Sequence, residues 1–347
     1  MYTGEDMATA SRDLDLAALI ADTEAEIGRL VQDQDPSTRG LYEMVRYHLA
    51  LDGSGASGGK RIRPLLGLLA YASITGDHRR ALPGAAAVEL GHNFSLVHDD
   101  IEDGDTERRH RATLWTVHGV PQAINTGDAL FSLSRIALHR LTDLGFPDAK
   151  VLRLMRLFDQ TCLRLCEGQY LDIAMSASDT LMTVELYFDM IGRKTAALIA
   201  ASVESGALLA TDDETVIARY HDFGWALGIA FQLNDDLLGI WGAEQATGKE
   251  PSDVAHRKKT LPVIYAWEQA GPEDRVRLAE LYATRDPDAA QVAEIIGILD
   301  RSGAREYTRD QARRYRDEAL AALDAAGVVE PAVREQLEGI IVSAISA

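Results

Sequence analysis

Residues 151–166 read VLRLMRLFDQTCLRLC, and their apolar side chains recur with the spacing of an α-helix. The apolar positions advance by steps of three and four: Val151, Leu154, Met155, Phe158, Cys162, Leu165 and Cys166. Such steps place the side chains on one face of a helix. Both cysteines lie on this stripe, so we expect them to be buried thiols rather than a metal-binding or redox pair.

The same helical periodicity extends outward from this stretch over most of the chain. It recurs at residues 13–34, 60–75, 82–103, 121–143, 179–209, 212–240 and 304–326. Strand-like alternation is absent, and Gly and Pro fall mostly between the periodic segments. The sequence therefore predicts an all-α fold. Because the composition does not change along the chain, we expect a single helical domain at 13–347. We expect residues 1–12 to be a disordered tail, as chain termini often are.

Composition and charge exclude several classes of function. The 347 residues are 46% apolar and 26% charged, which is typical of globular proteins. A net charge of −19 argues against nucleic acid or an anionic membrane as a partner. Two cysteines exclude a disulfide framework. There is no signal-peptide pattern and no long apolar segment, so we expect a cytoplasmic protein without stable membrane insertion.

Two acidic clusters stand out against this background. The first is VHDDIEDGDTERRHR at residues 97–111, and the second is FQLNDDLLGIWG at residues 231–242, where two carboxylates interrupt an apolar run. Ionised carboxylates in apolar surroundings need a counter-charge. Two such sets could face each other across a cavity and hold several Mg²⁺ ions, which bind hard oxygen ligands and bridge to phosphates. The pattern predicts a site that handles a diphosphate.

Helical spacing in the first cluster gives more detail. One continuous helix face carries Glu89, His92, Leu96, Asp99 and Asp103. Asp99 and Asp103 lie one turn apart, about 6 Å along the axis. A solvated acidic turn is the alternative for this cluster alone, because repulsion between like charges on an exposed helix costs little. The second cluster, inside an apolar helix, favours metal binding.

Basic residues near these clusters could hold phosphate groups. The segment GGKRIRP, residues 58–64, places Lys60, Arg61 and Arg63 at the expected start of a helix, where free N–H groups also favour anions. Further cations are Arg108, Arg109, Lys194, Lys249, Lys258 and Lys259. Each of these alone could equally be a solvated surface charge.

Together the motifs resemble those of the trans-isoprenyl diphosphate synthases, or polyprenyl synthetases. GGKRIRP, HDDIED with RRHR, GQYLD, GRKT, FQLNDD and the segment from TGK to RKKTLP follow in the family's order, over about residues 40–320. The resemblance implies an isoprenoid-synthase-type helical bundle around a central cavity. It also implies a homodimer that condenses isopentenyl diphosphate with allylic prenyl diphosphates.

The resemblance also implies roles for individual residues. The diphosphate of isopentenyl diphosphate would be held by Lys60, Arg63, His92 and Arg109. Three Mg²⁺ ions per active site, which Mn²⁺ can replace, would be bound by Asp99, Asp100, Asp103 and Asp235. The allylic diphosphate would also contact Arg108, Lys194, Thr195, Gln232, Lys249 and Lys258.

The chain departs from the family pattern in three places. Gly239 stands where many relatives carry a third aspartate of the second cluster, which puts the coordination of the third Mg²⁺ in doubt; Asp236 or Asp253 could compensate. RRHRAT replaces the commoner RRGxPT, and Arg257 replaces a frequent glycine before Lys258.

Product length is expected to depend on the residues just over one turn before the first cluster. In this family an aromatic side chain there resembles the floor of short-chain enzymes. Phe94 followed by the small Ser95 is most similar to synthases of the twenty-carbon product, geranylgeranyl diphosphate. Farnesyl diphosphate synthase is the alternative.

Two other classes of protein share the expected fold. A terpene cyclase would use Asp clusters and Mg²⁺ but needs no site for isopentenyl diphosphate, and the set Lys60, Arg63, His92 and Arg109 argues against it. A catalytically silent subunit of a two-component synthase should have damaged Asp motifs, of which Gly239 is the one hint.

Overall fold

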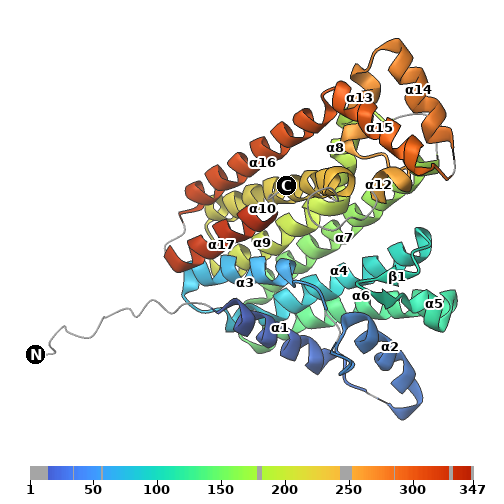
Figure 1. Cartoon of the computed structure of the whole chain (residues 1–347). Helices are drawn as coiled ribbons and strands as arrows, with labels where there is room; N and C mark the ends of the chain where they lie inside the picture. The colour runs from blue at the N-terminus through green and yellow to red at the C-terminus, as the bar shows by residue number, and fades with distance from the viewer. Residues whose placement is uncertain are drawn as a thin grey trace, which may run out of the picture. The chain divides into compact units, whose positions relative to one another are not determined.

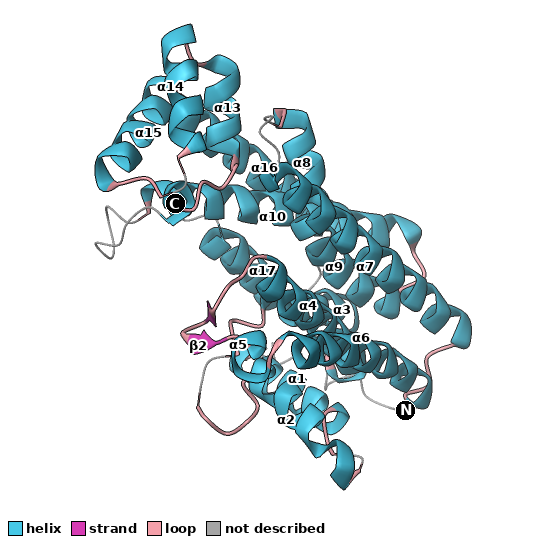
Figure 2. Ribbon diagram, turned by 90° about the vertical axis from the view of Figure 1, so that its right-hand side faces the viewer, coloured by secondary structure: helices cyan, strands magenta, loops and turns pink. Residues whose placement is uncertain are grey.

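A computed structural model describes residues 15–344, except for 34, 56–57, 178–181, 243–251, 285 and 328–330. The expected tail at 1–12 and the candidate ligand Lys249 lie outside the described residues. Those that are described form helices joined by short connections, with a single two-stranded hairpin (Figures 1 and 2). The all-α prediction is confirmed.

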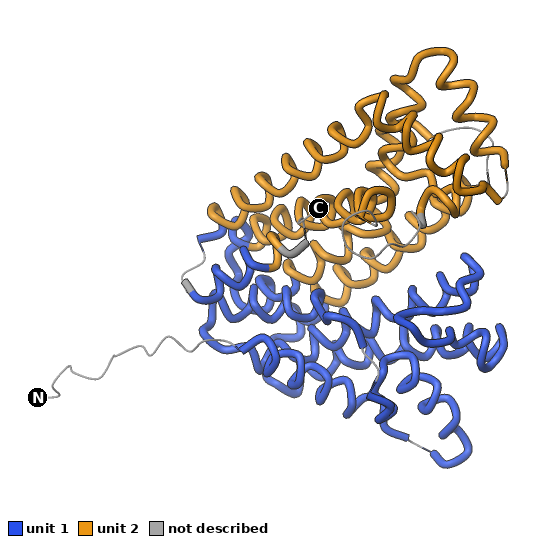
Figure 3. Tube along the Cα trace, viewed as in Figure 1, with its two compact units in different colours: residues 1–152, 205–216, 326–339 blue, residues 153–204, 217–325, 340–347 orange. Residues whose placement is uncertain are grey.

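The chain forms two compact units that interleave along the sequence (Figure 3). Unit 1 consists of residues 1–152, 205–216 and 326–339, and unit 2 of residues 153–204, 217–325 and 340–347. Five of the described helices contain residues of both units: α7 (Asp148–Ala177), α9 (Ala197–Ala210), α10 (Glu214–Trp241), α16 (Ala304–Ala326) and α17 (Pro331–Ala344). A single domain around a central cavity stays a prediction.

Unit 1 contains most of the N-terminal elements. They are α1 (Leu16–Leu30), η1 (Pro36–Thr38), α2 (Arg39–Leu49), α3 (Ile62–Thr75), η2 (Arg79–Ala81), α4 (Leu82–Glu102), β1 (Glu107–Arg108), β2 (Arg111–Ala112), α5 (Leu114–His118) and α6 (Val120–Asp143). Part of α17 (Pro331–Ala344) also belongs to this unit.

Helix α4 lies at the centre of unit 1, packed against α1, α3 and α6. Its residues from Pro83 to Gly91 are all buried. A helix buried on every side must be apolar all round, and small residues such as Gly84 and Ala86 let its neighbours approach closely. The core therefore fixes the helix whose C-terminal end carries the first acidic cluster.

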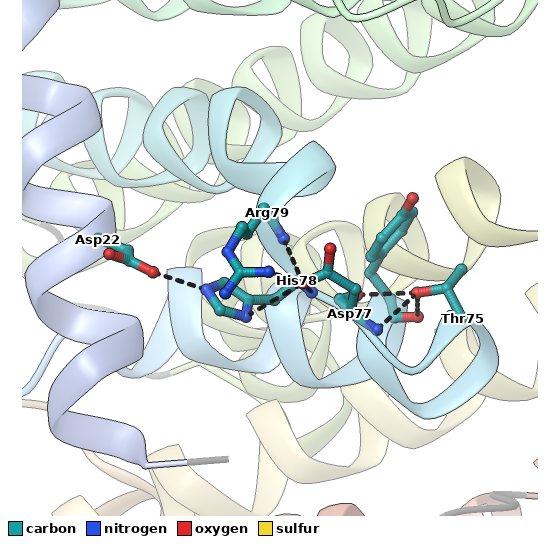
Figure 4. Close-up of polar contacts among 6 residues, drawn as sticks. Asp22, Thr75, Asp77, His78 and Arg79 are labelled. Atoms are coloured by element: carbon teal, nitrogen blue, oxygen red, sulfur yellow. Dashed lines mark hydrogen bonds and ion pairs between the residues drawn. The ribbon is translucent and has the colours of Figure 1, made fainter. Parts of the chain in front are cut away.

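Hydrogen bonds and ion pairs connect α1 to the segment before α4 (Figure 4). His78 Nε2 lies 2.7 Å from Asp22 Oδ2. The hydroxyl of Thr75 donates to the carbonyl of Asp77 at 2.8 Å, and the Asp77 carboxylate lies 3.3 Å from Arg79 Nη1. These contacts hold the turn between α3 and α4 and thereby fix where α4 begins.

Unit 2 contains the remaining helices. In addition to most of α7 and α10 it has α8 (Val184–Ile191), η3 (Gly192–Ala196), α12 (Ser252–Ala255), α13 (Leu261–Gln269), α14 (Pro272–Ala283), α15 (Ala289–Arg301) and α16 (Ala304–Ala326). Two buried apolar clusters form its core, and α10 contributes to both. None of the described helices is both long and apolar enough to span a membrane.

Glycines bring α10 against its neighbours in unit 2. A Cβ at Gly224 would lie 2.7 Å from the Cα of Ala200, and a Cβ at Gly228 would lie 2.6 Å from the Cα of Ala196. Both distances are well inside van der Waals contact, so only glycine allows this packing. The close approach places the second acidic cluster of α10 beside the segment that carries Lys194 and Thr195.

One prediction about α7 is wrong. Cys162 is buried, as expected, but Cys166 is exposed. The buried face of α7 continues through Leu165 and Gln169, which leaves Cys166 at its edge. There it lines an open groove together with Glu167 and Tyr170.

Candidate active site

The first acidic cluster ends α4. The backbone N–H of Asp103 donates to the carbonyl of Asp99 at 2.8 Å, so the two residues lie one helical turn apart, as the spacing predicts. Asp99 is half-buried and Asp103 is exposed. Two carboxylates stacked at a helix end are hard oxygen donors of the kind that Mg²⁺ binds.

Asp100, between them, has a different environment. Its carboxylate is buried, and Arg108 Nε donates to its Oδ1 at 2.6 Å. Burial raises the pKa of Asp100 to about 6, while the charge of Arg108 opposes the shift. Asp100 therefore pairs with Arg108 in this structure, and its predicted role as a Mg²⁺ ligand stays a prediction.

A tight hairpin presents the two arginines that follow. Strands β1 and β2 pair antiparallel, and the two residues between them, Arg109 and His110, have φ values of +52° and +61°. Positive φ at both central residues is the geometry of a type I′ turn, which matches the twist of paired strands. The glycine that relatives often carry at position 110 would adopt this geometry without strain. Here the residue is His110, which adopts a positive φ at some cost in backbone energy.

Arg111 and Tyr47 anchor this hairpin to α2. The Arg111 guanidinium lies over the Tyr47 ring, with its Cζ 3.9 Å from the centroid, and bonds to Asp52 at 2.7 Å. The Tyr47 hydroxyl donates to the carbonyl of Ala112 at 2.9 Å. The flanking contacts fix the direction in which Arg108 and Arg109 point.

The glycine pair before α3 makes room for two arginine side chains. A Cβ at Gly59, where φ is +93°, would lie 2.8 Å from Arg109 Cζ. A Cβ at Gly58 would lie 2.8 Å from Arg61 Cζ, and the carbonyl of Gly58 accepts a hydrogen bond from Arg109 Nη1. A side chain at either position would displace an arginine guanidinium, and the φ of +93° at position 59 favours glycine in any case.

Of the three cations that follow the glycines, Arg61 is the one that points inward. Its side chain is fully buried and pairs with the buried Glu89 at 2.6 Å. Asn93 also donates to Glu89, at 2.9 Å. Lys60 is exposed and Arg63 half-buried. The buried pair holds the start of α3 against α4, leaving Lys60 and Arg63 as candidate ligands.

His92 lies among the arginines of unit 1. Burial is the main cause that holds its pKa well below the usual value, followed by the positive charges of Arg63 and Arg109. His92 is therefore neutral at physiological pH, and its ring can donate one hydrogen bond to an anion. The structure thus brings His92 together with two of the residues predicted beside it.

Sequence reasoning missed a second histidine, His48 of α2. It lines a small cavity of about 30 Å³ together with Asp100, Arg108, Arg109 and Arg111. Burial lowers the pKa of His48 to about 3, and Arg108 adds to the effect. No sequence pattern pointed to His48, because its neighbours come from a distant hairpin.

Phe94 lies in the α4 core. It is 8% exposed, and its ring packs edge-on against Phe131 of α6 with centroids 5.2 Å apart. The neighbouring Ser95 hydroxyl bonds to the carbonyl of His92 at 2.8 Å. Phe94 therefore has a packing role whatever its effect on product length.

In unit 2, Lys194 and Thr195 lie in η3, a π-helical turn between α8 and α9. Such turns inside helices are frequent at functional sites. Lys194 Nζ bonds to Asp172 of α7, and a Cβ at Gly168 would lie 2.5 Å from the Lys194 backbone nitrogen. The glycine and aspartate of GQYLD therefore both position Lys194.

A hydrogen-bond chain runs from Thr195 to the second acidic cluster. Thr195 Oγ1 donates to Gln232 Oε1 at 2.9 Å, and Gln232 Nε2 donates to Asp236 Oδ1 at 3.2 Å. Asp236 Oδ2 accepts from the hydroxyl of Tyr187 and from the backbone N–H of Leu261 at 3.1 Å. Asp236 thus joins α8, α10 and α13.

Asp235 and Asp236 are adjacent but differ in environment. Asp235 is exposed, whereas Asp236 is 2% exposed. Burial raises the pKa of Asp236 to about 7, against the hydrogen bonds from Tyr187 and Leu261, which lower it. The exposed Asp235 remains the predicted cation ligand of the pair. Tyr187 was not predicted, because its partner lies in another helix.

Lys258 follows α12 and is largely exposed, with its Nζ 3.3 Å from Asp253 Oδ1. Arg257 before it has a φ of +55°. This left-handed conformation explains why relatives often carry glycine there. Lys259 Nζ donates to the carbonyl of Met175 at 2.6 Å and so anchors the loop.

The predicted carboxylates suit Mg²⁺ that is coordinated partly by the protein and partly by a bound phosphate. Among the described residues, no three His, Cys, Asp or Glu side chains come together as a complete metal site. Mg²⁺ in phosphate-handling enzymes is commonly held by one or two carboxylates together with phosphate oxygens and water. Asp99 and Asp103 in unit 1, and separately Asp235 in unit 2, are half-buried or exposed residues with donors of that kind.

Comparison with known proteins identifies relatives of the chain. The family model named polyprenyl synthetase matches residues 41–299. The chain is 39% identical over 317 residues to the geranylgeranyl diphosphate synthase of Mycobacterium tuberculosis, covering 89% of this chain and 88% of that protein. It is 40% identical over 293 residues to the (2E,6E)-farnesyl diphosphate synthase of Mycobacterium bovis, covering 81% and 78%.

A solved structure agrees with the sequence comparison. The geranylgeranyl pyrophosphate synthetase of Pyrococcus horikoshii Ot3 superposes with a TM-score of 0.87 and 34% identity, covering 96% of this chain and 98% of that one. The match spans both units. Motifs, fold and sequence identity lead to one conclusion: the chain belongs to the polyprenyl synthetase family.

Proposed function

We propose that the protein is a Mg²⁺-dependent short-chain trans-prenyltransferase, which condenses isopentenyl diphosphate with allylic diphosphates to give mainly geranylgeranyl diphosphate. The observation that carries the proposal is the basic cluster of unit 1. There the positive charges of Arg63, Arg109 and Arg108 help burial to lower the pKa of His92, which belongs to the same helix as Asp99. A terpene cyclase has no use for the part of this cluster that would bind isopentenyl diphosphate.

Lys60, Arg63, His92 and Arg109 would bind the diphosphate of isopentenyl diphosphate. The guanidinium groups supply charge-assisted hydrogen bonds, and the neutral imidazole adds a donor. Because the net charge of the chain is −19, these residues form a local basic pocket on an acidic protein. Bound in this way, isopentenyl diphosphate would be oriented for attack through its double bond.

The remaining candidates would serve the allylic diphosphate. Mg²⁺ bound by Asp99, Asp103 and Asp235 would neutralise the charge that develops on the departing pyrophosphate. Arg108, Lys194 and Lys258 would add positive charge, and Thr195 and Gln232 would orient that group. Lys249, which lies outside the described residues, is proposed for the same role.

The reaction itself needs no nucleophile from the protein. The allylic C–O bond breaks, the double bond of isopentenyl diphosphate attacks the resulting carbocation, and a proton then leaves the adduct. The released pyrophosphate is the base that we propose for this last step. Apolar helix faces keep water from the cation.

Purified protein incubated with Mg²⁺, isopentenyl diphosphate and each allylic primer in turn tests this function. We expect prenyl diphosphates longer than the primer, and only when isopentenyl diphosphate is present. Consumption of the allylic substrate alone would indicate a cyclase. Consumption of neither substrate would indicate a silent subunit.

The close approach of the Arg109 guanidinium to Gly59 leads to a testable prediction. Gly59→Ala should raise the KM for isopentenyl diphosphate by about tenfold to a hundredfold, because the new methyl group displaces the Arg109 guanidinium and removes a charged hydrogen bond. The KM for the allylic substrate should change much less. Steady-state kinetics with each substrate varied in turn would measure the difference.

Gly55→Ala is the matched control. Gly55 also has a positive φ, +72°, but a Cβ there would meet nothing within 4 Å. It introduces the same backbone strain without touching Arg109. Equal KM changes in the two variants would show that strain, rather than the position of Arg109, is responsible.

We also propose that Phe94 limits product length. Phe94→Ala should lengthen the product by one or more five-carbon units, because it removes bulk just over one turn before Asp99. It should also lower the free energy of unfolding by about 3–5 kcal/mol, since the ring is buried against Phe131. Mass spectrometry of the products gives the chain length.

Phe146→Ala controls for the loss of a core ring. Phe146 is 7% exposed and packs against Tyr71, elsewhere in unit 1. We expect comparable destabilisation but an unchanged product. Wild-type product from Phe94→Ala would place the limit at another residue.

Assembly as a homodimer completes the proposal. Exposed apolar side chains on α5 and α6 support a contact with a second copy of the chain: Val117, Val120, Ile124 and Ile136 are 40–50% exposed. Light scattering at micromolar concentration should give twice the chain mass of 37.9 kDa. Ile124→Asp should shift the mass toward that of the monomer. A monomer mass for the wild type would refute the dimer.

A further inference from the structure

We propose that Trp225 of α10 is a positioning residue of the active site, because its indole ring supports the π-helical turn η3 and so fixes where Lys194 points. The inference rests on the proposed function, in which Lys194 serves the allylic diphosphate, and it deepens that function. Trp225 itself touches none of the candidate ligands among the described contacts, so its effect would pass through the turn.

The turn η3 differs from an α-helix in its hydrogen bond. The backbone N–H of Ala197 donates to the carbonyl of Gly192, five residues earlier, whereas an α-helix uses the carbonyl four residues earlier. Such turns are rare, so we expect neighbouring helices to support this one. If η3 became α-helical, the register would shift by one residue, which is about 100° around the helix axis. Lys194 would then point in another direction.

Close backbone packing fixes two residues of the turn. A Cβ at Gly168 of α7 would lie 2.5 Å from the backbone nitrogen of Lys194, and a Cβ at Gly228 of α10 would lie 2.6 Å from the Cα of Ala196. Both contacts are with backbone atoms, which cannot turn aside as the end of a side chain can. Residues 194 and 196 are therefore fixed by α7 and α10.

Trp225 supports the turn at its first residue. It lies three residues before Gly228, so both face the same side of α10. A Cβ at Gly192 would lie 3.0 Å from Trp225 Cζ2 and 3.1 Å from Cη2, so the edge of the indole ring rests against the backbone of Gly192. The ring keeps Gly192 away from the α10 backbone, while Ala196 approaches that backbone directly. Helix α10 thus has bulk at one end of the turn and no side chain at the other.

The indole ring is itself held in place. His221, one turn earlier in α10, lies nearly parallel to it, with ring centroids 6.2 Å apart and planes inclined by 20°. Nδ1 of His221 lies 2.8 Å from Glu204 Oε2 of α9. Trp225 also packs against the buried apolar cluster that includes Ile191. A ring confined on these sides is a firm support for Gly192.

Lys194 is the candidate ligand whose position depends on this support. Its Nζ bonds to Asp172 of α7, which holds the ammonium in the direction that η3 sets. A smaller side chain at position 225 should let Gly192 move toward α10 and the turn relax toward an α-helix. The ammonium of Lys194 would then leave Asp172 and its place beside the allylic diphosphate.

The test measures the Mg²⁺-dependent binding of inorganic pyrophosphate by calorimetry, without turnover. Trp225→Leu should weaken this binding by about tenfold. Lys194→Ala should weaken it by about tenfold to a hundredfold, as expected for one charge-assisted hydrogen bond. Because the indole acts through Lys194, the double variant should bind within about twofold of Lys194→Ala. Trp225→Phe, a milder change, should show the same dependence on Lys194 with a loss of about threefold.

Turnover gives a second readout. Trp225→Leu should raise the KM for the allylic substrate by about tenfold and change the KM for isopentenyl diphosphate by less than about twofold. Trp267→Leu is the matched control, because Trp267 of α13 is a half-buried indole against the other core cluster of unit 2. It should lower the thermal unfolding temperature to a similar extent and leave pyrophosphate binding and both KM values unchanged.

Undiminished pyrophosphate binding by Trp225→Leu would overturn the inference. So would equal losses in Trp225→Leu and Trp267→Leu, or losses from Trp225→Leu and Lys194→Ala that multiply in the double variant. Condensation by the wild type is measured separately, so these results would leave the prenyltransferase function intact. A wild type that shows the dependence on Lys194 but does not condense substrates would overturn the function alone.

Discussion

Asp103→Ala should reduce turnover at saturating Mg²⁺ by about a thousandfold or more, equivalent to about 4 kcal/mol of transition-state stabilisation. Asp103 and Asp99 form the stacked pair at the end of α4, and Asp99→Ala should have the same effect. The fold should survive the loss of the Asp103 side chain, because Asp103 is exposed and closes α4 through its backbone N–H, which alanine retains.

Glu102→Ala is the matched control for this loss. Glu102 is exposed, belongs to the same turn and carries the same charge, but it is not a predicted metal ligand; it lies about 60° around the helix from Asp99 and about 100° from Asp103. We expect it to keep near-normal activity. Near-normal rates in Asp103→Ala, or an equal loss in Glu102→Ala, would contradict the assignment of the metal-binding face.

Glu89→Ala should lower the free energy of unfolding by about 3–5 kcal/mol. It removes the partner of a guanidinium that has no exposure to water, because Arg61 is fully buried and bonds to Glu89 at 2.6 Å. The loss also leaves a buried amide of Asn93 without one of its acceptors. Urea unfolding followed by circular dichroism would measure the change.

Glu24→Ala is the control, because it removes a partly exposed ion pair of the same arginine. Glu24 lies 3.3 Å from Arg61 Nε, but its side chain is 36% exposed. Solvent screening should limit its contribution to about 1 kcal/mol or less. Equal losses in the two variants would mean that burial does not decide the strength of the Glu89 pair.

Helical periodicity predicted much of this fold. The stripe at 304–326 coincides with α16, and the stripe at 82–103 with α4 and its capping residue. Helix α16 buries one regular apolar face, which is what periodicity detects, whereas α4 is recognised by a long apolar run between turn residues. The π-helical turn at Gly192–Ala196 was not predicted, since the sequence at 179–209 reads as one continuous stripe.

The candidate site was predictable where motif spacing lies along one helix. Asp99 and Asp103 show this, because four residues make one turn whatever surrounds them. The different environments of Asp235 and Asp236 were not predicted, since they depend on Tyr187 and Leu261 from other helices. His48 went unassigned for the same reason: its neighbours are set by tertiary packing.

The central claim is that the protein joins an allylic diphosphate to isopentenyl diphosphate with loss of pyrophosphate. The most direct measurement follows both quantities in one reaction, with radiolabelled isopentenyl diphosphate and an enzyme-coupled assay for pyrophosphate. We predict one pyrophosphate released for each isopentenyl diphosphate incorporated, with no reaction in excess chelator and full recovery on adding Mg²⁺. Pyrophosphate release without incorporation of isopentenyl diphosphate, or undiminished reaction in excess chelator, would contradict this account.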